Sequence, residues 1–187
     1  IGLPDIDQTD FKLTDLSLQS TYADLQVILP KLSNNKNFKL PEIVKILNTV
    51  SYQGDLHGLY NNFHIDGELK TELGALSTKS SLNFQNETQF SGLYESKSFD
   101  IGRFLNNSLL KTTGFNLNLK GKGSSSKTLS IDLDGNLENF NFRNYTYQQI
   151  PISGIIAEEK FKGSGSIKDP NASIDFQTDV DWSDTSV

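Results

Sequence analysis

Apolar and polar residues alternate along most of the chain with a period of two. The segment NFHIDGELKT has an apolar residue or glycine at every second position: Phe63, Ile65, Gly67 and Leu69. This pattern is typical of a β-strand with one face packed and one face in water, because successive side chains of a strand point to opposite sides. Similar runs recur as far as Trp182, and together they predict about ten strands.

Strands with one apolar face and short connections favour an antiparallel sheet. Turn sequences such as Asp134-Gly135 and KDPN, residues 168–171, separate neighbouring runs. The sequence therefore predicts an all-β fold with a few short helices.

Three segments break the alternation and space their apolar residues as a helix does: residues 22–32, 39–50 and 98–105. In the first, Pro30 should end or kink the helix. In the third, Ser98 is the predicted N-cap, Asp100 suits the first turn, and Ile101, Phe104 and Leu105 share the face that should pack on the sheet. Such a short helix needs that packing, since it is not stable alone.

These helical segments divide the chain. Four or five strands are predicted between the second and third helices, and about six after the third. The predicted parts are a strand with helical linkers (1–49), a first strand block (50–97), a short helical linker that crosses the sheet (98–110) and a second strand block (111–187). We expect them to form one continuous groove built from loose repeats, in a fragment of a longer protein.

Composition and charge exclude several classes of function. The chain has 187 residues, no Cys and a formal net charge of −6 without a basic run. A disulfide framework, a thiolate metal site and a catalytic Cys are therefore excluded. Nucleic acid is an unfavourable partner, because phosphate binding needs concentrated positive charge. No segment approaches the roughly 20 apolar residues of a membrane-spanning helix.

No constellation of residues indicates catalysis. His57 and His64 are the only histidines, and their pattern favours solvated side chains over metal ligands or bases. The stretch Asp132-Leu133-Asp134-Gly135-Asn136 is similar to a calcium loop, but its Gly is at position four rather than six and no Glu occupies position twelve. GKGSSSKT, residues 121–128, lacks the spacing of a phosphate loop. We predict a protein that is not an enzyme and has no catalytic residue, metal or cofactor.

The apolar faces are the remaining candidate for function. A closed sandwich or barrel core is their ordinary explanation, yet three short helices cannot cover about ten strands. The sheet must then fold on itself, pair with another sheet, or leave an apolar trough open to a nonpolar ligand.

The order of several segments resembles the TamB family of translocation and assembly module proteins, of the AsmA-like superfamily, in its Bacteroidota form. The matching elements are Tyr52-Gln53-Gly54 leading to Phe63, Phe99-Asp100-Ile101-Gly102, Gly121-Lys122-Gly123 and Asp169-Pro170-Asn171. The resemblance covers the chain from about residue 20. It implies an elongated, curved, mostly antiparallel sheet with a hydrophobic groove, the shape called a β-taco.

The resemblance also implies a function. The chain would be a segment of a periplasmic bridge, in a protein anchored to the inner membrane and reaching an Omp85-type partner in the outer membrane. The groove would carry phospholipid acyl chains between the membranes and support outer-membrane protein assembly. Its predicted lining is Phe63, Ile65, Leu69, Leu82, Phe84, Phe90, Phe115, Leu117, Leu119, Leu129, Ile131, Leu133, Phe161, Ile167, Ile174 and Phe176. The alternative is a scaffold or chaperone that engages outer-membrane protein strands by β-augmentation without carrying lipid.

Overall fold

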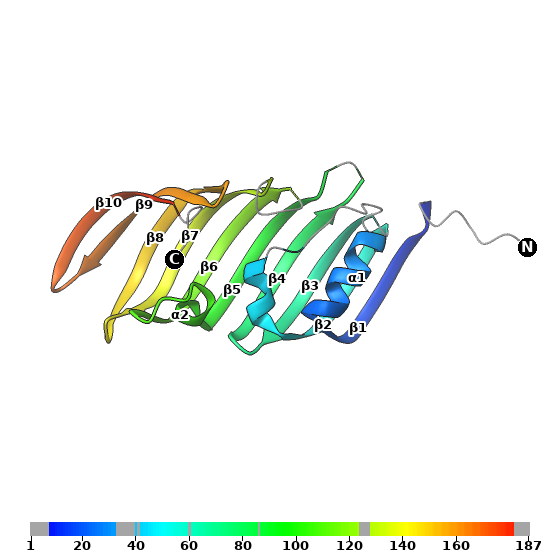
Figure 1. The fold of residues 1–187 in the computed structure, drawn as a ribbon, viewed down its shortest axis with the longest axis horizontal. Coiled ribbons are helices and arrows are strands. Elements are labelled where there is room, and N and C mark those ends of the chain that lie inside the picture. The colour runs from blue at the N-terminus through cyan, green and yellow to red at the C-terminus, as the bar shows by residue number, and fades with distance from the viewer. Residues whose placement is uncertain are drawn as a thin grey trace, which may run out of the picture.

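Ten strands form one sheet in sequence order, each antiparallel to the next (Figure 1). The computed structural model describes residues 8–32, 40, 42–59, 61–85, 87–123 and 128–181. Its strands are β1 (Asp10–Thr21), β2 (Thr49–Leu59), β3 (Asn62–Thr71), β4 (Gly74–Asn83), β5 (Gln89–Asp100), β6 (Leu110–Lys122), β7 (Ser130–Phe142), β8 (Tyr145–Ala157), β9 (Lys160–Asp169) and β10 (Ala172–Asp181). The predicted all-β class and the elongated, curved, antiparallel sheet are confirmed.

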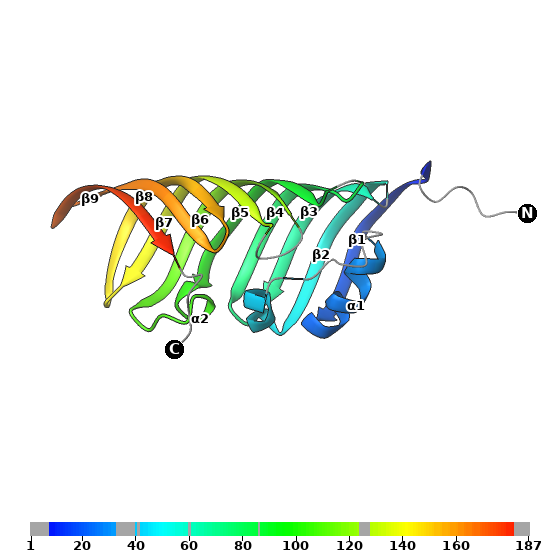
Figure 2. The ribbon, with the colours of Figure 1, turned by 45° about the horizontal axis from the view of Figure 1, so that its top comes forward.

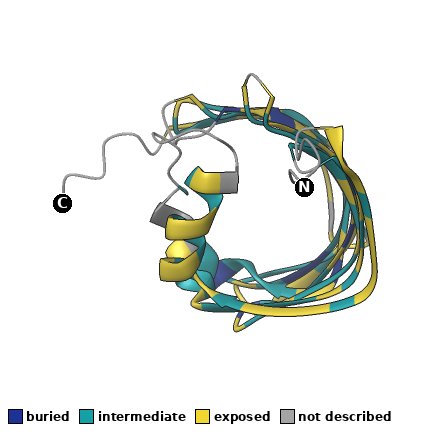
Figure 3. Ribbon diagram, turned by 90° about the vertical axis from the view of Figure 1, so that its right-hand side faces the viewer, coloured by how far each residue is buried: buried dark blue, intermediate teal, exposed yellow. Residues whose placement is uncertain are grey.

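The sheet curls about its long axis and leaves one side open (Figure 3). All ten strands belong to this sheet, and in the described part of the chain no second sheet packs against it. Of the three arrangements that the apolar faces allowed, the structure adopts the open one. Strands β1 and β10 lie at the two ends of the elongated sheet (Figures 1 and 2).

Three helical elements lie on the open side of the curl (Figure 3): α1 (Tyr22–Leu32), the 3-10 helix η2 (Glu42–Leu47) and α2 (Ile101–Phe104). Pro30 lies inside α1, so the helix continues past it for two residues rather than ending there. Ser98 is not the N-cap of α2: it lies in β5, and Asp100 caps the helix instead.

The strand blocks around α2 also differ in detail from the prediction. Four strands, β2 to β5, separate η2 from α2, within the predicted number. Five strands follow α2 in the described residues, rather than six. Strand β5 runs to Asp100 and β6 begins at Leu110, so the connection between them is shorter than residues 98–110. Trp182, predicted on the apolar face, lies outside the described residues.

The strand registers place every second residue on the same face across the whole sheet. Directly opposite residues in antiparallel strands share a face, so each register row can be followed from β1 to β10. One row contains Phe11, Gly58, Phe63, Leu82, Phe90, Gly121, Ile131, Ile156, Phe161 and Val180. The neighbouring row on the other face contains Lys12, His57, His64, Ser81, Ser91, Lys120, Asp132, Ile155, Lys162 and Asp179. The sheet therefore has one apolar and one largely polar face.

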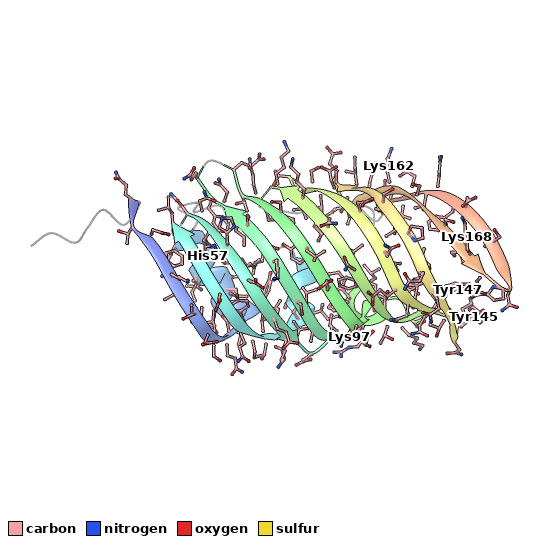
Figure 4. The ribbon with its side chains drawn as sticks, turned by 180° about the vertical axis from the view of Figure 1, so that it is seen from behind. His57, Lys97, Tyr145, Tyr147, Lys162 and Lys168 are labelled. Atoms are coloured by element: carbon pink, nitrogen blue, oxygen red, sulfur yellow. The ribbon has the colours of Figure 1, made fainter. Side chains whose placement is uncertain are left out.

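The apolar face is the concave one. Phe104 of α2 packs its ring on Phe99, with centroids 5.6 Å apart, and Phe99 contacts Phe115 of the apolar face at 6.1 Å. Helix α2 lies on the open side of the curl (Figure 3). Figure 4 views the sheet from behind, with the helices beyond it, and shows His57 and Lys162 of the polar row.

Glycines on the concave face make room for the curvature. A Cβ on Gly121 would lie 2.2 Å from Cζ of Phe90, its register neighbour, so the Phe90 ring occupies the place of the missing side chain. Gly165 and Phe176, also register neighbours, are arranged alike, and a Cβ on Gly165 would lie 2.4 Å from Cζ of the Phe176 ring. Aromatic rings over cross-strand glycines are a known means of stabilising curved sheets.

The ladder between β8 and β9 is short. Ile152–Ala157 pair with Lys160–Gly165, and the rest of each strand pairs only with its other neighbour. The ladder ends at Pro151, which has no N–H to donate to a neighbouring strand. The β9–β10 hairpin is thus joined to the sheet through six of the ten residues of β9.

A side-chain clasp joins the strands where this ladder is missing. The Tyr145 hydroxyl donates to Asp169 Oδ1 at 2.6 Å, and Asn171 Nδ2 donates to the Tyr145 oxygen at 2.8 Å. The backbone N–H of Asn171 also donates to Asp169, at 3.0 Å. Two hydrogen bonds lower the pKa of Asp169 below its usual value. The bond from the Tyr145 hydroxyl has the larger effect, and the bond from the Asn171 N–H has the next largest.

We expect Gly135→Ala to destabilise the sheet by about 1–3 kcal/mol. Gly135 has φ of +154°, and a Cβ there would lie 2.2 Å from the Asn116 carbonyl oxygen, which belongs to the neighbouring strand and cannot move aside cheaply. Urea unfolding measures the loss. Asn118→Ala, on the exposed convex face, is the matched control, and equal effects of both changes would contradict the explanation.

Tyr145→Phe should raise the pKa of Asp169 towards its ordinary value, which a carboxyl-detected NMR titration measures. Because folding lowers this pKa, the clasp stabilises the fold above the pKa of Asp169 in the unfolded chain, and its contribution disappears as pH falls through the folded pKa. The difference in stability between the wild type and Tyr145→Phe should therefore shrink in acid. Tyr147→Phe is the control, and an unchanged Asp169 titration in Tyr145→Phe would refute the assignment.

Candidate functional site

The candidate site is the apolar trough along the concave face, which we define by three register rows. The first row, given above, has an apolar side chain or glycine on all ten strands. The second row contains Leu13, Leu56, Ile65, Ser80, Gly92, Leu119, Leu133, Gly154, Gly163 and Thr178. The third row contains Leu16, Gly54, Gly67, Thr78, Tyr94, Leu117, Gly135, Ile152, Gly165 and Phe176. None of the three rows contains a charged residue.

The registers bring the sequence-predicted lining residues together. Ten lie in the three rows: Phe63, Leu82, Phe90, Ile131, Phe161, Ile65, Leu119, Leu133, Leu117 and Phe176. Leu69, Phe115, Ile167 and Ile174 lie one position further along the same face, beside the third row. Phe84 contacts the Phe63 ring at 5.9 Å, and Leu129 directly precedes β7.

The trough is open rather than filled. Among the described residues no large side chain is completely buried, and Leu73 and Ile150 are the buried hydrophobic residues. Leu13 of β1 and Val180 of β10, at the two ends of the trough, are each 47% exposed. A closed core of this size would bury many such side chains. The concave face therefore offers a largely apolar surface to a ligand, and its first row is apolar on all ten strands.

The opposite face is charged and solvated. Lys79 and Asp66 form an ion pair at 3.2 Å across β3 and β4, and Lys162 and Asp179 form one at 3.1 Å across β9 and β10. All four side chains are more than half exposed, so each pair contributes little to stability. The charges keep the convex face in water and leave the trough as the apolar side.

Several trough residues are not among those predicted from the sequence. The trough extends to β1 through Leu13, Leu16 and Leu56. For the two β1 residues, the apolar positions in the segment FKLTDLSL could have predicted this. Thr78 and Ser80 interrupt the apolar surface on β4. They are 7% and 5% exposed, and their hydroxyls lie 2.6 Å apart, within hydrogen-bonding distance. This pair places a small polar spot on β4 in the largely apolar trough. The sequence could have shown it, because Thr78 and Ser80 are separated from Leu82 by an even number of residues and so share its face.

Helix α2 closes over the trough locally. The backbone N–H of Arg103 donates to Asp100 Oδ1 at 2.9 Å, which caps the helix. Gly102 is needed for the close approach to β6, because a Cβ would lie 2.2 Å from the Leu110 carbonyl oxygen. Phe104 contacts Phe99, as described. Leu105, predicted to pack with it, is 50% exposed.

Glu72, in the turn between β3 and β4, ties two helical segments to one rim of the trough. Its carboxylate accepts a hydrogen bond from Asn48 Nδ2, just after η2, at 2.7 Å. It also forms an ion pair with Arg103 of α2 at 3.6 Å. The Asp100 N–H donates to the carbonyl of the adjacent Leu73. This turn therefore sets the position of the helical rim.

Comparisons with known proteins give no relative. No protein-family model, curated protein or solved structure matches the chain. The resemblance to the TamB family therefore stays a prediction. None of the described helices is long and apolar enough to cross a bilayer.

We expect Phe104→Asn to lower the free energy of unfolding by about 1–2 kcal/mol, because it removes a half-buried ring from Phe99. Amide hydrogen exchange should accelerate at α2 and the start of β6 while β3 and β8 stay protected. Leu105→Asn is the matched control, for which we expect a change within about 0.5 kcal/mol. If exchange accelerated across the whole sheet, α2 would not be a local joint.

Proposed function

We propose that the trough binds the acyl chains of phospholipids and that the chain serves as a segment of a TamB-like periplasmic bridge carrying lipid between inner and outer membranes. The observation that supports this most is the first register row, which runs across all ten strands without a polar side chain. An uncharged apolar surface of this length on an open concave face matches an extended hydrocarbon ligand better than a compact one. The role in outer-membrane protein assembly and the Omp85-type partner rest on the family resemblance.

The dimensions suit several acyl chains. Ten strands spaced about 4.8 Å apart span about 43 Å along the hydrogen-bonding direction. One leaflet of a bilayer has a hydrocarbon depth of about 15 Å, half of the core, so the trough is longer than one lipid. Each buried CH2 contributes about 0.8 kcal/mol, which makes a partly enclosed chain stable in the trough.

The structure also suggests how lipid could move. Similar apolar contacts repeat from strand to strand, so a chain that slides along the trough exchanges one set of contacts for an equivalent set. No deep pocket is needed to hold it. The headgroup would stay at the open side of the curl, in water. At the Thr78–Ser80 pair and at α2, a sliding acyl chain would meet contacts that differ from those in the rest of the trough.

A scaffold that binds outer-membrane protein strands by β-augmentation is the alternative. The end strands β1 and β10 each have one neighbour in the described sheet, and an unpaired strand edge can accept another strand. This alternative predicts protein at the sheet edges and does not need an apolar trough.

A photo-crosslinker at Leu117 should capture phospholipid in cells, whereas one at Asn118 should not. These adjacent residues point to opposite faces of β6, so they form a matched pair in the same strand. Mass spectrometry of the crosslinked products identifies the lipid. Protein captured by a crosslinker placed in the end strands β1 or β10, with no lipid at Leu117, would favour the scaffold. Equal lipid capture at Leu117 and Asn118 would overturn the trough.

A second measurement separates binding from accidental contact. Ile131→Asp should reduce lipid capture at Leu117, because placing a charge in an apolar environment is costly. Ser91→Asp, on the convex face, is the control and should leave capture unchanged. Circular dichroism verifies that both variants keep their strands.

A further inference from the structure

The two histidines of the chain meet on the convex face, away from the trough. His57 of β2 and His64 of β3 are directly opposite in the register. Their rings are stacked, with centroids 5.0 Å apart and an angle of 24° between the planes. Both side chains are exposed, and Figure 4 shows His57 on this outer face. The β2–β3 hairpin thus joins side chains that the sequence pattern alone does not connect.

The distance between the rings is within the range for two imidazoles bound to one metal ion, but the stacked rings must turn to bind it, because a metal lies in the plane of each imidazole. A metal–nitrogen bond of about 2.0–2.1 Å places the ion about 3.2 Å from the ring centroid. Two such rings have centroids about 5.2 Å apart at a tetrahedral angle and about 4.5 Å apart at a right angle. The observed 5.0 Å lies between these values. Because both side chains are exposed, their torsions can turn one nitrogen of each ring towards a shared ion.

Ser81 of β4 orients one of the rings. Its hydroxyl lies 2.8 Å from His64 Nδ1. When Nδ1–H donates to this hydroxyl, the lone pair of Nε2 is free to face the solvent and bind a metal. A hydrogen bond from the second ring nitrogen to a neighbouring group is the usual support of a metal-bound histidine. Ser81 is therefore placed as such a support.

The surrounding charges are mixed. Asp55 and Asp66 are opposite each other at the next position of the same face, beside the histidines. Asp66 is paired with Lys79, and Asp55 accepts a hydrogen bond from the Asp15 N–H. Lys12 of β1 is opposite His57 and is the cation nearest in the register. Lys79 offsets Asp66 and Asp55 offsets Lys12, so the charges around the histidines balance and do not repel a divalent ion.

The sequence alone predicts solvated histidines and no metal, but the pairing of His57 with His64 across β2 and β3 changes that expectation. We propose that His57 and His64 form a surface site for one divalent transition-metal ion of the nickel and zinc class. The described residues contain no cluster of three or more His, Cys, Asp or Glu side chains suited to a metal, so the protein supplies two imidazole ligands and water completes the coordination. Hard ions such as Mg²⁺ prefer oxygen ligands and should not bind here. The bound ion links β2 to β3 on the outer face, and this site does not depend on lipid binding in the trough.

Isothermal titration of the full chain with Ni²⁺ or Zn²⁺ tests the proposal, with a purification tag that contains no histidine. We expect one ion per chain, no binding of Mg²⁺, and weaker binding as the pH falls, because protons compete for the imidazoles. Histidine ring signals in NMR should shift or broaden together. His57→Gln and His64→Gln should each reduce the affinity at least about tenfold.

Two further variants make the result specific. Ser81→Ala should reduce the affinity without abolishing binding, because it removes the support and not a ligand. Lys12→Gln should increase the affinity, because it removes the opposing cation. Unchanged affinity in either histidine variant would mean binding to carboxylates elsewhere and would overturn the proposal, as would the absence of any Ni²⁺ or Zn²⁺ binding by the wild type.

Discussion

The crowding of side chains on the concave face is the constraint on which the rest of the structure depends. When a sheet curls, the side chains of its inner face converge, and large residues at every inner position could not be accommodated. The chain meets this constraint by placing glycines opposite aromatic residues, as Gly121 lies opposite Phe90 and Gly165 opposite Phe176. The rings then cover neighbouring backbone instead of filling the space between the walls. The same glycine–aromatic pairs thus permit the curvature and leave the interior unfilled.

An unfilled interior gives the protein an unusual distribution of apolar surface. Its stability comes from the main-chain ladder and from contacts between neighbouring strands, while the inner side chains remain partly accessible. Such a surface is costly in water, and a hydrocarbon ligand would remove that cost. The architecture therefore connects the way the sheet is stabilised with the ligand proposed for it. The charged convex face interacts with water, while the proposed ligand binds on the concave face.

The helical segments act on one rim rather than on the whole trough. Glu72 holds the end of η2 and helix α2 through Asn48 and Arg103, and the Phe104 ring lies on Phe99. At the other end of the sheet, the last hairpin is attached through the six-residue β8–β9 ladder and the Tyr145–Asp169 clasp. The trough thus has a braced section around α2 and a less constrained section at β9 and β10.

The sequence alone determined the strands and the side of each strand that is apolar, because a period of two is local and needs no knowledge of partners. It therefore predicted Phe63, Leu117 and Ile131 on one face. It could not determine that Ser98 lies in β5 while Asp100 caps α2, since both residues suit an N-cap and the strand end decides between them. Nor could it show that the inner glycines bend the sheet, because that role depends on which residue lies opposite. The pairing of His57 with His64 likewise came only from the register of β2 and β3, which is a property of the assembled sheet.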